Sequence, residues 1–237
     1  MTDRDPFRAV SRDDGQDDDR TLLWEPGPRV QPSAPAPVIG EKQPKRRRGL
    51  AFRIARHGLM AFAAYYVFCL VLLIAYRWVN PPTTGVQIQR RVESVFSGGE
   101  YRKRRSFVAL DDLPRHVPRA VVAAEDGRFW DHSGYDWVEM SRAGREAGSG
   151  VRVRGASTLT QQLMKNLFGC ACRNPVRKVY DLTLTPAAEL ILGKRRILEL
   201  YLNQVEWGDE GVFGIDAGAR EHYDRPATRL TRTQAAG

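Results

Sequence analysis

One uncharged and mostly apolar run, residues 58–76, separates two parts of the chain that differ in pattern. At about 1.5 Å per helical residue this run covers a hydrocarbon layer of roughly 30 Å. Trp78 follows it, where an interfacial aromatic residue is expected. No polar face interrupts the run, and no small-x-small cleavage motif follows Ala75. The pattern therefore predicts one transmembrane helix over residues 58–78, and neither a core helix nor a signal peptide.

Beyond Pro81 the apolar positions recur at helical spacing. Leu159, Leu163 and Leu167 follow one another every four residues. A further apolar face consists of Ile197, Leu198, Tyr201 and Leu202. Strand-like alternation is scarce, and the Gly- and Arg-rich residues 144–155 predict a mobile loop between two helices. We expect a mainly α domain over residues 80–237.

The segment ahead of the apolar run, residues 1–57, is rich in Asp, Pro and Arg and predicts a disordered cytoplasmic tail. Its last part is a basic juxtamembrane block formed by Lys42, Lys45, Arg46, Arg47, Arg48, Arg53 and Arg56. Fewer basic residues follow the run closely, so the positive-inside rule keeps the N-terminus in the cytoplasm. The domain after the run is then expected on the other side of the membrane.

The chain has a net charge of +9 and a pI of about 9.8. Such a charge attracts nucleic acid, anionic lipid or a phosphorylated substrate. The basic block contains no interleaved aromatic residue before Phe52, so it lacks a surface on which bases would stack. We therefore expect the block to attract lipid head groups, and we expect no nucleic-acid partner.

The first candidate for chemistry is the pair Glu125-Asp126, which stands at the end of an apolar helix face. A carboxylate held beside Phe129 and Trp130 in a partly dry site would have a raised proton affinity, which suits a general base. Taken alone, the pair is equally compatible with an ordinary acidic helix end.

The second candidate is the segment RGASTLTQQLMKN, residues 154–166. Structurally, Ser157 or Thr158 is suited to cap the start of a helix. Functionally, a polar wall would be formed by Ser157, Thr158, Gln161 and Gln162. Gln161 and Lys165 share one helix face at i,i+4 spacing, and a lysine at that place suits a phosphate oxygen.

Arg177, Lys178 and Asp181 form the third candidate. Lys178 and Asp181 are three residues apart, so both side chains can face one site. An exposed ion pair there would contribute at most about 1 kcal/mol to stability. The functional interpretation is a pyrophosphate clamp beside a carboxylate that holds a divalent cation. The residues alone leave both interpretations open.

In this order, four motifs resemble the peptidoglycan glycosyltransferases, the family of the monofunctional biosynthetic transglycosylases and of the N-terminal domains of bifunctional penicillin-binding proteins. The motifs are E-D-x-x-F-x-x-H-x-G from Glu125, G-x-S-T-x-T-Q-Q-x-x-K-N from Gly155, R-K at Arg177 and K-x-R-I-L-E-x-Y-L-N from Lys194. The resemblance begins near Val108 and implies a lysozyme-like glycosyltransferase domain behind one N-terminal transmembrane helix.

The resemblance also implies an activity, the polymerisation of lipid II into glycan strands with inversion at the anomeric carbon and release of undecaprenyl pyrophosphate. Glu125 would be the general base. Asp181 would be a second catalytic carboxylate and the ligand of a divalent cation, Mg²⁺ or Mn²⁺. The implied substrate-binding residues are Asp126, Ser157, Thr158, Gln161, Lys165, Asn166, Arg177 and Lys178.

Partners and location follow from the same resemblance. The partners would be lipid II, the growing glycan strand, the membrane and other cell-wall synthesis proteins. The location would be the bacterial inner membrane, which the chain crosses once, with a cytoplasmic N-terminus and a periplasmic catalytic domain.

Two departures from the family pattern leave alternatives open. Asp181 stands where the family has Glu, so a weakly active scaffold of the cell-wall synthesis machinery is the alternative function. A lytic hydrolase is less favoured, because hydrolysis does not need the basic residues Lys165, Arg177 and Lys178 together. Family members continue past the position of Gly237, so we expect the domain to be incomplete at its C-terminus.

Overall fold

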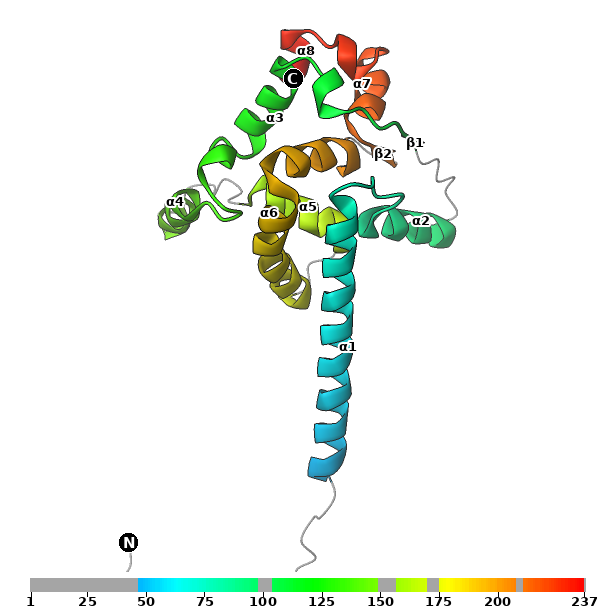
Figure 1. Cartoon of the computed structure of the whole chain (residues 1–237), viewed down its shortest axis with the longest axis vertical. Coiled ribbons are helices and arrows are strands. Elements are labelled where there is room, and N and C mark those ends of the chain that lie inside the picture. The colour runs from blue at the N-terminus through cyan, green and yellow to red at the C-terminus, as the bar shows by residue number, and fades with distance from the viewer. Residues whose placement is uncertain (1–46, 98–103, 149–156, 170–174, 208–210, 237) are drawn as a thin grey trace, which may run out of the picture. The chain divides into compact units, whose positions relative to one another are not determined.

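The computed structural model describes residues 47–97, 104–148, 157–169, 175–207 and 211–236, without the side chains of residues 47, 48, 104, 147 and 175–180. These ranges are mainly helical (Figure 1). The α-helices are α1 (Arg47–Tyr76), α2 (Gly85–Ser97), α3 (His116–Glu125), α4 (Trp137–Gly148), α5 (Leu159–Phe168), α6 (Pro175–Gln204), α7 (Ile215–Tyr223) and α8 (Arg232–Ala236). Short 3₁₀ turns cover Leu110–Asp112, Phe129–Asp131 and Ala227–Arg229.

The strands in the described ranges form one short parallel pair, β1 (Arg104–Arg105) with β2 (Val212–Phe213), beside an isolated antiparallel bridge between Glu206 and Phe213. The predicted mainly α fold is confirmed. Two expected boundaries differ from the structure. The helix of the apolar run already begins at Arg47, because the basic residues before Gly58 continue its backbone hydrogen bonding. Helix α4 extends to Gly148, into the expected loop 144–155, whose remaining residues lie outside the described ranges.

Helix α1 is long and apolar enough to cross a membrane. Its stretch Gly49–Tyr76 has 28 residues and a mean hydropathy of 2.3, and only 11% of the most apolar window is buried. Leu59, Phe68 and Val71 are exposed on it. A core helix of a soluble protein would bury most of such a surface. The apolar, exposed surface of α1 is therefore suited to lipid.

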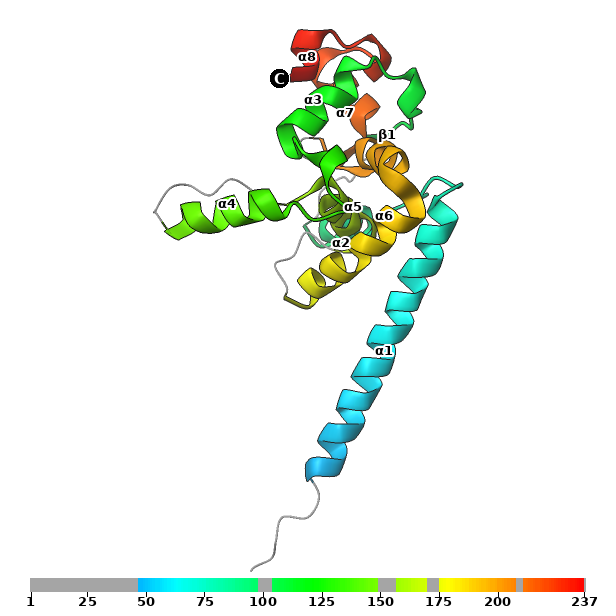
Figure 2. The ribbon, with the colours of Figure 1, turned by 60° about the vertical axis from the view of Figure 1, so that its left-hand side comes forward.

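The C-terminal turns of α1 pack against the helical domain. Cys69 and Leu73 are completely buried there. The Tyr65 hydroxyl donates a 2.6 Å hydrogen bond to the backbone oxygen of Phe168 at the end of α5. The Arg196 guanidinium of α6 donates to the backbone oxygen of Tyr76 at 2.9 Å. The end of α1 is thus attached to both α5 and α6, and Figure 2 shows it beside α6.

The domain core is the packing of α5 against α6. The predicted stripe is confirmed, because Leu159, Leu163 and Leu167 are all buried. On α6 the second predicted face, Ile197, Leu198, Tyr201 and Leu202, is buried as well. Helix α6 changes direction at Gly193, whose φ of 72° is readily adopted only by glycine. The kink lets the two halves of α6 pack on different neighbours.

Candidate functional site

Glu125 is the last residue of α3, and its position follows from the way that helix ends. Val117, Val121 and Val122 bury one face of α3. Asp126 then leaves helical geometry with φ −155° and ψ 72°, while its N–H still donates to the Val122 oxygen at 2.9 Å. The helix therefore stops at the site and presents Glu125 as an exposed residue.

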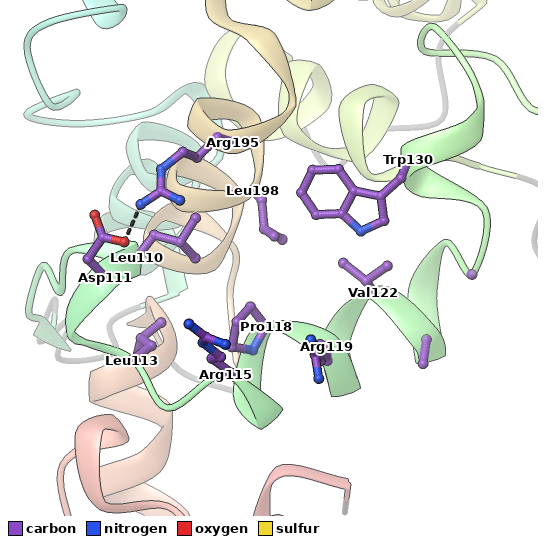
Figure 3. Close-up of a pocket in the computed structure, with 12 residues that line it drawn as sticks. Leu110, Asp111, Leu113, Arg115, Pro118, Arg119, Val122, Trp130, Arg195 and Leu198 are labelled. Atoms are coloured by element: carbon purple, nitrogen blue, oxygen red, sulfur yellow. Dashed lines mark hydrogen bonds and ion pairs between the residues drawn. The ribbon is translucent and has the colours of Figure 1, made fainter.

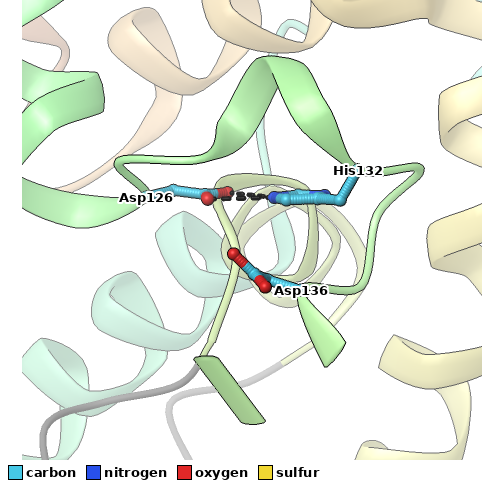
Figure 4. Close-up of side chains that lie close together, drawn as sticks. All are labelled: Asp126, His132 and Asp136. Carbon is cyan, nitrogen blue, oxygen red and sulfur yellow. Dashed lines mark hydrogen bonds and ion pairs between the residues drawn. The ribbon is translucent and has the colours of Figure 1, made fainter. Parts of the chain in front are cut away.

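Asp126 ties three segments together beside Glu125. Its carboxylate accepts a hydrogen bond from Nε2 of His132 at 2.9 Å and from the backbone N–H of Leu159 at 3.0 Å. Leu159 is the first residue of α5, where unpaired N–H groups favour an anion. The Asp126 and His132 side chains are only 4% and 6% exposed. The buried contacts of Asp126, of which Figure 4 shows the one with His132, hold the end of α3 against the start of α5.

Asp126, His132 and Asp136 together are a group that could hold a metal ion, with one ligand atom from each residue within 4.8 Å of the others. One oxygen of Asp136 also lacks a hydrogen-bond partner among the described residues. The imidazole argues against a metal, however. Its Nδ1 accepts the N–H of Gly134 at 3.1 Å, so the ring proton belongs on Nε2, which donates to Asp126. A metal-ligating histidine normally donates from its second nitrogen, so this ring does not fit as a ligand.

Glu125 itself is oriented by a chain of two hydrogen bonds, which we call the Tyr201 relay. The Nε2 of Gln162 on α5 donates to Oε2 of Glu125 at 3.0 Å. The Tyr201 hydroxyl on α6 donates to Oε1 of Gln162 at 3.1 Å. Burial, followed by the charge of Glu125, raises the pKa of Tyr201, which keeps its hydroxyl protonated as a donor. The relay therefore fixes the amide of Gln162 with its NH₂ group toward Glu125.

Glu125 borders a cavity of about 340 Å³ between the end of α3, α4 and the start of α5. Two guanidinium groups, those of Arg128 and Arg142, line it together with Asp136 and Glu139. Arg128 lies 3.3 Å from Asp136, and Arg142 lies 3.4 Å from Glu139. The cavity thus combines the oriented carboxylate of Glu125 with two guanidinium groups, each of which is paired with an acidic side chain of the same cavity.

A second and larger cavity, about 730 Å³, lies between α3 and the second half of α6 (Figure 3). Ala123 and Gly127 line both cavities, so the two adjoin at the end of α3. Its floor is apolar, and it is bordered by Arg115, Arg119 and Arg195, of which Arg195 pairs with Asp111. We assign the chemistry to the smaller cavity, because the oriented carboxylate of Glu125 opens there.

The prediction that Glu125 lies in a partly dry site is wrong. Phe129 is completely buried, while Trp130 is 57% exposed and lines the larger cavity. Glu125 is exposed, so the groups that act on it are hydrogen-bond donors. Phe129 instead packs under Lys194, whose Nζ lies 4.2 Å from the ring centre. That contact fastens the turn after Glu125 to α6.

Of the residues that the sequence singles out, Ser157 and Thr158 line the Glu125 cavity together with Asp126. Thr158 also caps α5. Its hydroxyl accepts the N–H of Gln161 and the Gln161 side chain accepts the N–H of Thr158, each at 3.3 Å, which makes a capping box. The structural interpretation of Thr158 is thus realised, and Gln161 is buried in the same device.

The remaining predicted residues are not among the described residues that line the Glu125 cavity. Asn166 is buried and donates to the Gln162 backbone oxygen at 2.9 Å, while Lys165 is half-buried on α5. Asp181 is buried on α6, 6% exposed. The side chains of Arg177 and Lys178 lie outside the described part of the structure. The substrate and metal roles of these residues stay predictions.

Four residues at the site were missed or underrated from sequence. The sequence pattern predicts Tyr201 as part of an apolar helix face and Gln162 as one member of a polar wall. Arg128 lies inside the Glu125 motif, at a position that the motif leaves open, and Arg142 lies on the amphipathic helix α4, yet neither stands out in a chain so rich in arginine. Proximity to Glu125 in sequence was the only available signal, and it applies to Arg128 alone.

The described residues form a mainly helical domain with an oriented carboxylate, preceded by a helix that is long and apolar enough to cross a membrane. Residues 90–237 match the protein-family model described as "Transglycosylase". The chain belongs to this transglycosylase family, whose domain is lysozyme-like, as the motifs predicted.

Several curated relatives carry the name "Biosynthetic peptidoglycan transglycosylase". The protein of Pseudomonas entomophila is 42% identical over 184 residues, which are 78% of this chain and 76% of the relative. The protein of Pseudomonas fluorescens is 42% identical over 171 residues, 72% of this chain and 71% of the relative. The protein of Ectopseudomonas mendocina is 42% identical over 165 residues, which are 70% of this chain and 68% of the relative.

Proposed function

We propose that this chain is a peptidoglycan glycosyltransferase that polymerises lipid II into glycan strands. The observation that carries the proposal is the carboxylate of Glu125, oriented by Gln162 at the edge of a cavity lined by Arg128 and Arg142. Family membership and the names of the relatives agree with it.

In the proposed mechanism Glu125 removes the proton from the 4-hydroxyl of the acceptor sugar. The oxygen then attacks the anomeric carbon of the lipid-linked donor, the bond to the pyrophosphate breaks, and the configuration inverts. The leaving group takes the bonding electron pair, so it needs positive charge in place before the reaction. Among the residues whose side chains the structure describes, Arg128 and Arg142 are candidates to supply this positive charge. The sequence motifs offer three more candidates, Lys165, Arg177 and Lys178.

A divalent cation, Mg²⁺ or Mn²⁺, remains part of the proposal. When bound, it would shield the charge of the pyrophosphate. Asp181 is the carboxylate that the sequence motif offers for it, and the Asp126–His132–Asp136 group is less suitable because of its histidine. Removal of the ion with a chelator, followed by addition of Mg²⁺ or Mn²⁺, should abolish and then restore polymer formation.

We also propose that α1 anchors the enzyme in the inner membrane with the N-terminus in the cytoplasm. The apolar exposed surface of α1 and the basic block before it support this orientation. Alkaline phosphatase, which is active only when exported, would be fused after Gly237. An active fusion agrees with the orientation, and an inactive but intact fusion contradicts it.

The test of the activity uses the purified full chain, lipid II and Mg²⁺. We expect polymeric glycan from the wild type and none from Glu125→Gln, because the amide accepts no proton. Glu93→Gln on α2 removes an exposed carboxylate outside the cavity and should retain full activity. Absence of polymer from the wild type would refute the transferase and favour the scaffold alternative. Free disaccharide in place of polymer would favour a hydrolase.

A further inference from the structure

Helix α2 carries an exposed apolar stripe that the proposed mechanism does not use. The stripe consists of Ile88, Val92, Val95 and Phe96, which are 53%, 48%, 75% and 86% exposed. Their spacing of four, three and one residues places them on one side of the helix. A contiguous apolar surface that is exposed in this way indicates an interaction site.

The opposite side of α2 is fixed to the domain. Val86 and Gln87 are buried, and Gln87 contacts Gln204 at the end of α6. Arg90 donates two hydrogen bonds, of 3.1 and 3.0 Å, to one carboxylate oxygen of Glu206. The stripe therefore cannot turn inward without breaking these contacts, and it must be covered from outside or stay in water.

The connection from α1 to α2 is short and held in place. Residues 77–84 join the two helices, and Arg105 donates to the backbone oxygens of Pro81 and Pro82 at 2.6 and 2.9 Å. The start of α2 packs closely on the end of α5, because a Cβ on Gly85 would lie only 2.3 Å from the backbone oxygen of Gly169, the residue after α5. Helix α2 is thus placed rigidly relative to the end of α1.

The direction of the stripe follows from this placement. Helix α2 runs across the axis of α1 at the height of its C-terminal end (Figure 1). In both views the last part of α6 lies on the side of α2 away from the free end of α1 (Figures 1 and 2). Since α2 binds that part of α6, its opposite side, the apolar stripe, faces in the direction in which α1 extends.

We infer that α2 lies on the outer surface of the membrane that α1 crosses, with its stripe inserted among the lipids. The inference rests on the proposed anchor. An amphipathic helix at an interface buries its apolar face by about 5–10 Å, and bulky residues such as Phe96 suit that depth. Arg91 is exposed beside the stripe and can reach the lipid phosphates. Trp78 and Val79, 73% and 61% exposed between the helices, suit the same interface.

This second contact would give the domain a fixed tilt. With α1 as the only contact, the helix and the domain attached to it could still tilt together in the bilayer. Two contacts on a rigid frame, α1 and α2, hold the Glu125 cavity at a constant height above the bilayer. A substrate whose lipid tail stays in that bilayer would then find its reacting end at the right level.

The test places a photoreactive benzoylphenylalanine at one of three positions of the full chain, reconstituted in vesicles of equal parts phosphatidylethanolamine and phosphatidylglycerol. Phe96 represents the stripe, and its neighbour Ser97, exposed on another side of the same helix, is the matched control. Val71, 57% exposed, represents α1. All three side chains lie outside the core, so the substitutions leave the packing intact.

We expect lipid adducts from positions 71 and 96, and several-fold fewer from position 97. Equal labelling of lipid from positions 96 and 97, with strong labelling from 71, would overturn the docking of α2 and leave the anchor intact. Failure at position 71 would instead contradict the anchor of the proposed function. A crosslink from position 96 to another copy of the chain, without lipid adducts, would assign the stripe to a protein interface and overturn the inference.

Discussion

Replacement of Tyr201 by Phe tests whether the Tyr201 relay positions Glu125, the proposed general base. The substitution removes one hydroxyl from a side chain that is 3% exposed and leaves the ring in place. Gln162 Oε1 loses its donor, so the amide is held only by the bonds from its NH₂ group to Glu125 and to the Ser157 backbone oxygen. The side chain of Gln162 is then less firmly fixed, and the orientation that it imposes on the Glu125 carboxylate is weaker.

The expected size follows from the energy of one hydrogen bond. A neutral intramolecular hydrogen bond contributes about 0.5–1.5 kcal/mol net. Gln162 is only partly buried, so water replaces some of the loss, and about 1 kcal/mol is a reasonable value. This energy corresponds to a fall in kcat of roughly fivefold. Loss of a general base costs about 10²–10⁴-fold, so Glu125→Gln should be far more severe.

The assay is the initial rate of polymer formation from lipid II at several concentrations. KM should stay constant while kcat falls, because the relay acts on the base. Tyr66→Phe is the matched control, since it removes a hydroxyl that donates to the Thr183 oxygen at 3.2 Å, away from Glu125. The double variant Tyr201→Phe with Gln162→Ala should be no slower than Gln162→Ala alone.

Two outcomes would refute this reasoning. An unchanged kcat in Tyr201→Phe means that Gln162 keeps its orientation without the tyrosine. A loss as large as that of Glu125→Gln means that the hydroxyl takes part in the reaction itself. Additive effects in the double variant would likewise separate Tyr201 from Gln162.

Two more predictions concern buried ionisable groups. Because the pKa of Tyr201 is raised in the folded state, its contribution to stability is complete below about pH 10, the unfolded value, and is lost as pH rises toward the folded value. We therefore expect the free energy of unfolding, measured with urea, to fall between about pH 9 and about pH 11 in the wild type. In Tyr201→Phe this fall should be smaller by about 1 kcal/mol. An equal fall in both proteins contradicts the prediction. Asp181→Glu should raise kcat if the shorter carboxylate limits the rate, and should lower the free energy of unfolding by about 1–3 kcal/mol, because the added methylene enters a buried site. A kcat that is unchanged or lower removes the support for a catalytic carboxylate at this position.

The fold could be predicted where the pattern is local. The apolar run of α1, the stripe of Leu159, Leu163 and Leu167 and the buried face of α6 all follow from residues three or four apart, since a helix brings these onto one side. The helix ends were less certain. Basic residues form a helix as readily as a tail, so α1 begins well before the apolar run.

The position of Glu125 was also determined by the sequence, because the motif around it is long and continuous. Its surroundings were decided by the tertiary structure. Gln162 lies 37 residues from Glu125 along the chain, Tyr201 lies 39 residues from Gln162, and Leu159 lies 33 residues from Asp126. Periodicity shows which side of a helix is buried, but not which hydrogen-bond partner another helix brings to it. Only the packing of α3, α5 and α6 turns an acidic helix end into an oriented carboxylate.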